Sequence, residues 1–99
     1  MYTVIKSARF DLWLDKLRDR VAAARIAARI RLAGQGNLGD WKALRDGISE
    51  MRVDVGAGYR LYFTRRGQSI IVLLCGGDKR GQKRDIERAI GLAQQWQEE

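Results

Sequence analysis

The amino-acid sequence predicts an α+β fold, an antiparallel sheet with two N-terminal helices and a C-terminal helix. Apolar residues recur at helical spacing within residues 8–33 and again within 82–97, whereas from residue 48 the apolar period changes to two. The 99 residues contain no proline, no internal repeat and no linker. We therefore expect a single domain, residues 1–99, with the element order β-α-α-β-β-β-α.

The first third of the chain predicts a strand and two helices. Residues 2–6 (YTVIK) are mostly β-branched or aromatic and indicate a short strand. Ser7 suits the N-cap of a helix that ends near residue 17, and Asp19 suits the N-cap of a second helix, which Gly34 ends. The apolar stripes of the two helices, which we expect to be buried, are Phe10, Trp13, Leu14 and Leu17, and then Val21, Ala22, Ile26, Ile30 and Ala33.

The second half predicts a three-stranded meander and a final helix. Residues 48–55 and 59–64 alternate between apolar and polar, which is typical of half-buried strands. Residues 69–75 are apolar on both faces, as expected of a strand covered on two sides. We expect residues 35–47 to form an ordered loop, residues 82–97 to form the last helix, and the helices to pack on one face of the sheet. The expected buried positions are Leu38, Trp41 and Leu44 beneath the loop, and Ile86, Ala89, Ile90, Ala93 and Trp96 in the last helix.

The chain is strongly basic, with 19 Lys and Arg against 12 Asp and Glu, or +7. This imbalance predicts a polyanionic or acidic partner. Residues 1–33 hold eight basic and three acidic side chains (+5), and residues 48–66 hold four and two (+2). The two basic regions therefore allow two different partners. Within the first, we expect Arg18, Arg25 and Arg29 to share the solvated side of the second helix.

The composition excludes several kinds of site. With no histidine, the chain has no Ser-His-Asp triad and no histidine-containing zinc site. Its single cysteine, Cys75, lies in an apolar run and is expected to be a buried, reduced thiol. We expect no metal and no cofactor. No signal segment is evident at the start, and the longest apolar run is too short to span a membrane, so we expect a cytoplasmic protein without membrane contact.

Polar side chains on the predicted sheet are the candidates for chemistry. Glu50, Arg52 and Asp54 share one face of their strand, and Arg60 and Tyr62 project from the next. Guanidinium groups on a rigid sheet can bind a phosphodiester bidentately and stabilise the charge that builds as its bond breaks. The alternative is a solvated face with weak ion pairs. Further candidates for substrate binding are Tyr59 or Tyr62 as a platform for a base, and the basic or polar residues after the last strand, Lys79, Arg80, Gln82, Lys83 and Arg84.

Three short strings resemble a known family. They are Glu50-Met51-Arg52-Val53, Gly58-Tyr59-Arg60-Leu61-Tyr62-Phe63, and Leu73-Leu74-Cys75-Gly76-Gly77-Asp78-Lys79 followed by Gln82 and Asp85-Ile86. Together with the length and the order of elements, they resemble the HigB-like branch of the RelE/ParE toxin superfamily, the "addiction module killer" proteins. The resemblance implies a toxin of a type II toxin–antitoxin module. RelE/HigB members cleave mRNA without metal, usually in the ribosomal A site, by attack of a 2′-OH on its own 3′-phosphate.

The resemblance also implies roles for single residues. Arg60 would hold and stabilise the phosphate, Arg52 would assist from the adjacent strand, and Lys79 would be a second charge stabiliser or a proton carrier. Gln82 would position the substrate, and Glu50 is a candidate general base or the structural partner of Arg52. The implied partners are a cognate antitoxin, mRNA and the ribosome. Two alternatives stay open: a ParE-like inhibitor of DNA gyrase, and a non-catalytic nucleic-acid-binding module.

Overall fold

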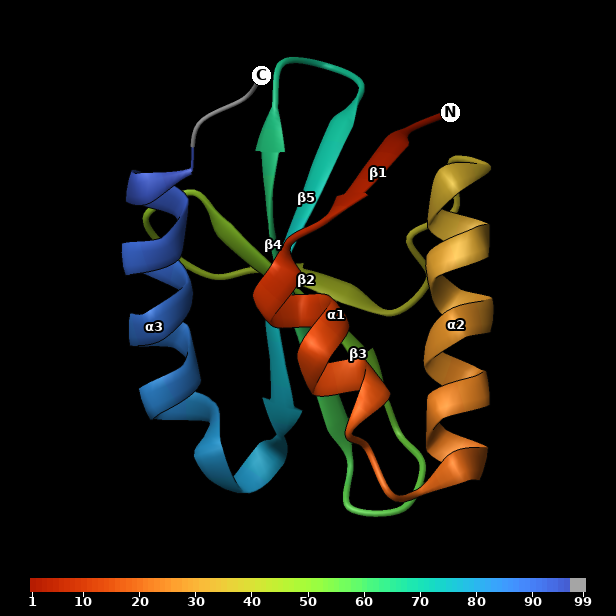
Figure 1. Cartoon of the computed structure of the whole chain (residues 1–99). Helices are drawn as coiled ribbons and strands as arrows, with labels where there is room; N and C mark the ends of the chain where they lie inside the picture. The colour runs from red at the N-terminus through yellow and green to blue at the C-terminus, as the bar shows by residue number, and fades with distance from the viewer. Residues whose placement is uncertain (97–99) are drawn as a thin grey trace.

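The core of the protein is a five-stranded sheet with helices on both faces, as a computed structural model of the chain shows (Figure 1). The structure describes residues 1–96. Its elements are β1 (Thr3–Lys6), α1 (Ala8–Asp15), α2 (Arg20–Gly34), β2 (Trp41–Ala43), β3 (Ile48–Val53), β4 (Tyr59–Arg66), β5 (Ile70–Asp78), the 3-10 turn η1 (Lys79–Gly81) and α3 (Gln82–Gln95). The predicted α+β class is confirmed. Gln97, the expected end of the last helix, lies outside the described residues.

The sheet has the order β1-β5-β4-β3-β2 and is mixed rather than wholly antiparallel. β3, β4 and β5 form the predicted antiparallel meander. β1 pairs with β5 in parallel, with Thr3 opposite Ile70. β2 adds an antiparallel edge strand within the predicted loop, with Lys42 opposite Glu50. A strand of three residues is too short to show a hydrophobic period of two. The sequence of a strand also does not tell whether its neighbour in the sheet runs parallel or antiparallel to it.

The expectation that all helices pack on one face is wrong. α1 and α2 bury Phe10 and Ile26 against Met51 and Leu61, whereas α3 covers the opposite face. The strands β1, β3, β4 and β5 each contribute to both cores, because successive side chains of a strand point to opposite faces. The core beneath α3 contains Ile48, Tyr62, Val72, Leu74, Cys75 and Ala89. The prediction that the last strand is covered on both sides is therefore confirmed.

The predicted N-caps hold the helices at the ends of the strands. The Ser7 hydroxyl accepts a hydrogen bond from the Phe10 N–H at 3.0 Å and donates one to the Leu74 carbonyl at 2.9 Å. The Asp19 carboxylate accepts from the Ala22 N–H at 3.0 Å. Both caps satisfy N–H groups that have no partner within the helix. Ser7 thereby also ties α1 to the sheet.

Two predicted core positions are exposed. The side chain of Val21 is 63% exposed at the start of α2, and Trp41 is 39% exposed on the edge strand β2. Instead of packing beneath the loop, Trp41 stacks on Arg65, whose guanidinium carbon lies 5.0 Å from the centroid of the Trp41 ring. An edge strand has a neighbour on one side only, so its side chains are covered less than those of β4. Leu38, by contrast, is buried as predicted.

Cys75 is a buried free thiol, as expected, and burial raises its pKa to about 11. No helix in the described part of the chain is long and apolar enough to cross a membrane.

Candidate functional site

The candidate arginines lie side by side in one row across the sheet. Arg52 on β3 is directly opposite Arg60 on β4, and Arg60 is opposite Gly77 on β5. The next row on the same face begins with Glu50, opposite Tyr62. This face is the one that α3 covers, and the row lies at its lower end in Figure 1, where β5 ends and α3 begins. The register thus brings together residues that are eight positions apart in the sequence.

Glu50 lies between the two arginines. Its Oε2 is 3.7 Å from Arg52 Nε, and its Oε1 is 3.9 Å from Arg60 Nε. Glu50 is 4% exposed and Arg60 is 9% exposed, whereas the Arg52 side chain keeps about a third of its surface. A buried carboxylate needs positive charge nearby, and two guanidinium groups supply it here. Glu50 therefore holds both arginines on one face of the sheet.

Two exposed carboxylates complete the ion pairs of the row. Asp40 Oδ1 is 3.6 Å from Arg52 Nε, and Asp54 Oδ1 is 3.5 Å from Arg60 NH1. The two aspartate side chains are 54% and 73% exposed. Because both carboxylates are exposed, their ion pairs contribute less free energy than fully buried pairs would, and a phosphate can replace either carboxylate. Asp40 lies in the predicted loop, and its approach to Arg52 depends on the edge pairing of β2, which the sequence pattern does not reveal.

Arg29 holds this region in place from α2. Its guanidinium donates hydrogen bonds to the carbonyl of Arg52 at 2.6 Å, of Leu38 at 2.9 Å and of Asp40 at 3.2 Å. The expectation that Arg29 lies on the solvated side of its helix is therefore wrong. One guanidinium group can donate hydrogen bonds to several carbonyls at once. This suits an irregular segment whose carbonyls are not paired in a β-ladder.

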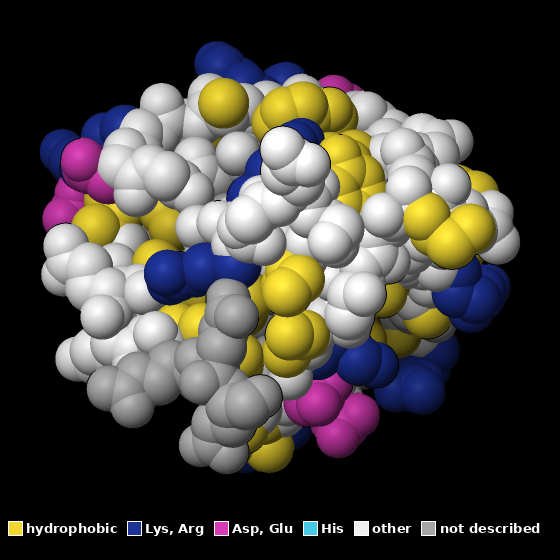
Figure 2. Space-filling view, turned by 90° about the horizontal axis from the view of Figure 1, so that it is seen from above, with side chains coloured by type: hydrophobic (Ala, Val, Ile, Leu, Met, Phe, Trp, Pro, Cys, Tyr) yellow, Lys and Arg dark blue, Asp and Glu magenta, His cyan; other side chains and the backbone are white. Residues whose placement is uncertain are grey.

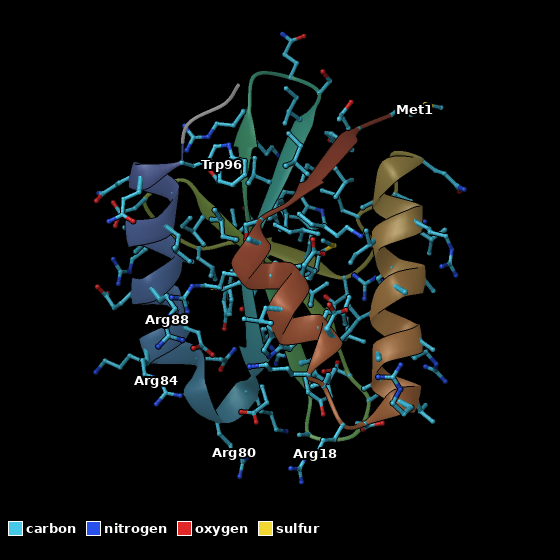
Figure 3. All side chains as sticks on the ribbon, viewed as in Figure 1. Met1, Arg18, Arg80, Arg84, Arg88 and Trp96 are labelled. Atoms are coloured by element: carbon cyan, nitrogen blue, oxygen red, sulfur yellow. The ribbon has the colours of Figure 1, made fainter. Side chains whose placement is uncertain are left out.

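Lys79 lies at the same end of the sheet as the arginine row. Its N–H donates to the Gly58 carbonyl at 2.8 Å, and its exposed side chain passes over Gly58. Arg80 follows, pairs with Asp78 at 3.1 Å and thereby lowers the pKa of that carboxyl. Figure 3 shows Arg80, Arg84 and Arg88 following one another along η1 and the start of α3, with Arg18 at the same lower end.

Gln82 and Lys83 border a groove that also includes Glu50. This groove has a volume of about 450 Å³ and lies between the first turns of α3 and the segment around β2. The structure therefore brings two of the predicted substrate-binding residues next to the acidic member of the arginine row. The groove's other lining residues are Lys42, Leu44, Arg45 and Ile86, none of which the sequence pattern singled out as a site residue.

The two candidate tyrosines are buried. Tyr59 is 8% exposed and packs on Trp13, with ring centroids 6.3 Å apart. Tyr62 is fully buried beneath α3, and burial, with a smaller contribution from the charge of Glu50, raises its pKa far above the ordinary value. Neither ring offers a free face for stacking on a base. Strand alternation puts Tyr62 on the correct face but cannot tell that a helix covers it.

The Gly76-Gly77 pair is explained by close packing on both faces of β5. A Cβ atom at Gly76 would collide with the Trp13 ring, and one at Gly77 would collide with the Asp85 carboxylate of α3. Asp85 is 4% exposed, and burial raises its pKa although Arg88, 3.4 Å away, opposes the shift. Asp85 thus adds a buried acid beside the arginine row, which the sequence analysis did not assign to the site.

Acidic, cysteine and histidine side chains in the described part of the chain form no group of three that could hold a metal ion. The opposite end of the molecule is seen in Figure 2, where Lys and Arg side chains lie in several separate groups instead of one continuous patch.

A mixed sheet with two N-terminal helices and one C-terminal helix is compatible with the class of protein that the family match shows, the RelE/HigB-like toxin superfamily. Within this superfamily, the chain belongs to the family "Phage derived protein Gp49-like", whose model matches residues 12–97. Membership suggests the toxin of a toxin–antitoxin pair. The more specific HigB-like assignment stays a prediction.

The match to a curated relative covers a similar length of the chain as the family match does. The chain is 49% identical over 86 residues to an uncharacterized protein of Haemophilus influenzae (strain Rd), and the match covers 87% of each chain. The similarity therefore covers most of the chain, including the strands that carry the arginine row.

Proposed function

We propose that this protein is the toxin of a type II toxin–antitoxin module and a metal-independent endoribonuclease. It cleaves mRNA on the ribosome, in the cytoplasm, and so stops translation and growth. The observation that carries this proposal is the pairing of Arg52 with Arg60 across two strands, both braced by Glu50. Two guanidinium groups fixed on a sheet suit one phosphodiester, whose charge grows in the transition state.

The proposed reaction is an internal transfer within the RNA. The 2′-hydroxyl gives its proton to solvent water as its oxygen attacks the adjacent phosphorus, the bond from phosphorus to the 5′-oxygen breaks, and the leaving 5′-oxygen takes up a proton, so that a 2′,3′-cyclic phosphate and a 5′-hydroxyl result. The phosphate oxygens replace Asp54 and Asp40 as the partners of Arg60 and Arg52. Lys79, exposed at the same end of the sheet, acts as a charge stabiliser or carries the proton to the leaving oxygen.

The ion pairs of Glu50 favour one of its two predicted roles. A general base must reach the hydroxyl whose proton it accepts. Glu50 is 4% exposed and faces two arginines, which favours the role of structural partner. We therefore assign Glu50 to positioning the arginines.

The antitoxin has a basic surface available on the N-terminal helices. α2 contains four arginines and no acidic residue, and only Arg29 among them is held by the sheet region. Arg20, Arg25 and Arg31 are exposed. A basic helix surface attracts an acidic partner segment.

Induced expression tests the proposal. We expect growth arrest, loss of protein synthesis and intact DNA, and mapping of transcript 5′-ends after brief induction should show new ends within coding regions. A matched culture expressing the chain with its antitoxin provides the control. The gyrase alternative predicts the opposite pattern, with DNA damage, inhibited supercoiling in vitro and unchanged transcript ends. That pattern would overturn the ribonuclease proposal.

A further inference from the structure

The two arginines of the row are held by different kinds of neighbours. Arg60 is paired through the β-ladder on both sides, with β3 and with β5. Arg52 lies on β3, whose regular pairing with β2 ends one residue earlier, at Met51 opposite Trp41. Backbone groups beyond the end of a ladder must find their hydrogen-bond partners elsewhere. The position of Arg52 therefore depends on contacts from outside the regular sheet.

Arg29 of α2 supplies these contacts. The Arg52 N–H donates to the Asp40 carbonyl at 2.9 Å, and the carbonyl of a strand residue points to the same neighbour as its N–H. The Arg29 guanidinium donates to this Arg52 carbonyl at 2.6 Å and to the Asp40 carbonyl at 3.2 Å. It thus takes the place that a longer β2 would hold beside Arg52. It also fixes the backbone of both residues in the Asp40–Arg52 ion pair.

The segment before β2 is built around this guanidinium. Gly39 has a φ of +64°, and a Cβ atom there would lie 2.8 Å from a terminal nitrogen of Arg29. Glycine adopts this left-handed conformation without strain and leaves the space that the guanidinium fills. The carbonyl of Leu38, which is buried, accepts a third hydrogen bond from Arg29 at 2.9 Å. A planar fork of donors fits these three acceptors, whereas the single ammonium group of a lysine does not.

We propose that Arg29 is a positioning residue for RNA cleavage and acts through Arg52; the inference rests on the proposed function. The three hydrogen bonds of Arg29 go to carbonyls of the chain, so its effect on a phosphate is indirect. Arg52 meets the same phosphate as Arg60 only while its backbone holds it opposite Arg60. Misplacement of a catalytic group by about 1 Å costs about 10²-fold in rate.

Cleavage kinetics on purified ribosomes carrying mRNA test this role in R29K. We expect kcat to fall about tenfold or more with little change in KM, because both phosphate-binding arginines are still present. In an R52K background, R29K should cause no further loss, since the group through which it acts is gone. R9K, an exposed arginine on α1, is the matched control. A wild-type kcat in R29K, or an undiminished loss in the R52K background, would overturn the inference.

Gly39 offers a second variant that leaves Arg29 itself in place. G39A should displace the guanidinium and lower kcat as R29K does. G67A is the control, because Gly67, in the turn between β4 and β5, has a φ of +66° and open space around an added Cβ. Both variants force alanine into the left-handed region, but only G39A crowds Arg29. Equal effects of G39A and G67A on kcat, measured below thermal unfolding, would contradict the proposal.

NMR of the arginine side chains reports the same contact without any cleavage. In the isotope-labelled full chain, R29K should move the Nε–H signal of Arg52 and leave that of Arg60 in place, the two signals being assigned from R52K and R60K. An unmoved Arg52 signal would refute the positioning role even where R29K lowers activity. A wild-type chain that cleaves no RNA would overturn the proposed function instead, because the Arg52 signal still shows whether Arg29 positions that residue.

Discussion

The two faces of the sheet use the same strands for different purposes. On the face under α1 and α2, the inward side chains are apolar, and Met51 and Leu61 have no exposed surface. On the face under α3, the upper part is apolar, but the lower rows hold Glu50, Arg52 and Arg60. A strand alternates between the two faces, so one segment can serve stability and chemistry at once. In β3, Met51 and Val53 hold the fold, whereas Glu50 and Arg52, on the opposite face of the same strand, form the candidate site.

Replacement of Arg60 by lysine is the strongest test of the α3 face. Lysine keeps the positive charge beside the buried Glu50, so the fold should persist, but it lacks the planar fork that binds a phosphate bidentately. We expect a loss of cleavage of about 10²- to 10³-fold, as for removal of one transition-state donor. R65K, an exposed position of the same strand, is the control, and thermal unfolding verifies the fold. A fully active R60K variant contradicts the assignment of Arg60.

Replacement of Leu61 by alanine tests the opposite face. Leu61 is fully buried beneath α1 and α2, so the change should lower the free energy of unfolding by about 2–5 kcal/mol. Urea denaturation measures this loss. Cleavage per folded molecule, measured well below the unfolding transition, should stay near the wild-type value. A large loss of activity in the folded variant would show that the two faces are not separable.

Replacement of Asp54 by asparagine sharpens the description of the site. If a phosphate binds Arg60 as proposed, Asp54 competes with it, and removing the Asp54 charge should tighten RNA binding by ~2- to 5-fold, the range expected of an ion pair with an exposed partner. Anisotropy with a fluorescent, fully 2′-O-methylated RNA measures binding, since this RNA has no hydroxyl to attack phosphorus. D15N on α1 makes the same change in net charge on the other face. An equal effect of both variants would point to net charge instead of the Arg60 pair.

The smallest expected effect concerns the pH dependence of stability. Burial holds the pKa of Asp85 above its ordinary value of 3.8, so the folded state binds this proton more tightly than the unfolded state. Its contribution to the free energy of unfolding therefore falls as the pH rises from 3.8 through the folded pKa. Relative to wild type, D85N should gain stability as the pH is raised from about 4 toward neutrality.

Asp78 provides the control of opposite sign for this measurement. Its pKa is lowered by Arg80, so its stabilising contribution is lost as the pH falls through the folded pKa. The difference between D78N and wild type should therefore change most at acidic pH. Identical pH profiles for D85N and D78N would contradict both assignments.

Much of the fold could be predicted because it rests on local patterns. Ser7 and Asp19 are recognisable N-caps, and a cap acts within its own first turn. The alternation in β3 and β4 predicted that Arg52 and Arg60 share a face, since side-chain direction has a period of two. The burial predicted for Val21 is wrong, because the apolar stripe of a helix does not reveal how far the sheet extends beneath that helix.

The strand residues of the candidate site could be predicted from the sequence, but the helices and segments that surround them could not. Arg60 and Glu50 were expected on an outer face, yet both are buried, because α3 packs on that face rather than with the other helices. Arg29 was expected in solvent, but three carbonyls of the β2–β3 region surround its guanidinium. These contacts join residues that are distant in sequence, and no local period encodes them.

By itself, the sequence determined the α+β class, the existence of the three-stranded meander, the buried Cys75 and the fact that Arg52 and Arg60 share a face of the sheet. Only the tertiary structure decided the parallel pairing of β1, the edge strand β2, the opposite placement of α3, and the groove that joins Lys42 to Lys83. The reason is physical. Caps and alternation depend on neighbours within a few residues, whereas the face that a helix covers depends on which packing buries the most apolar surface in the whole chain.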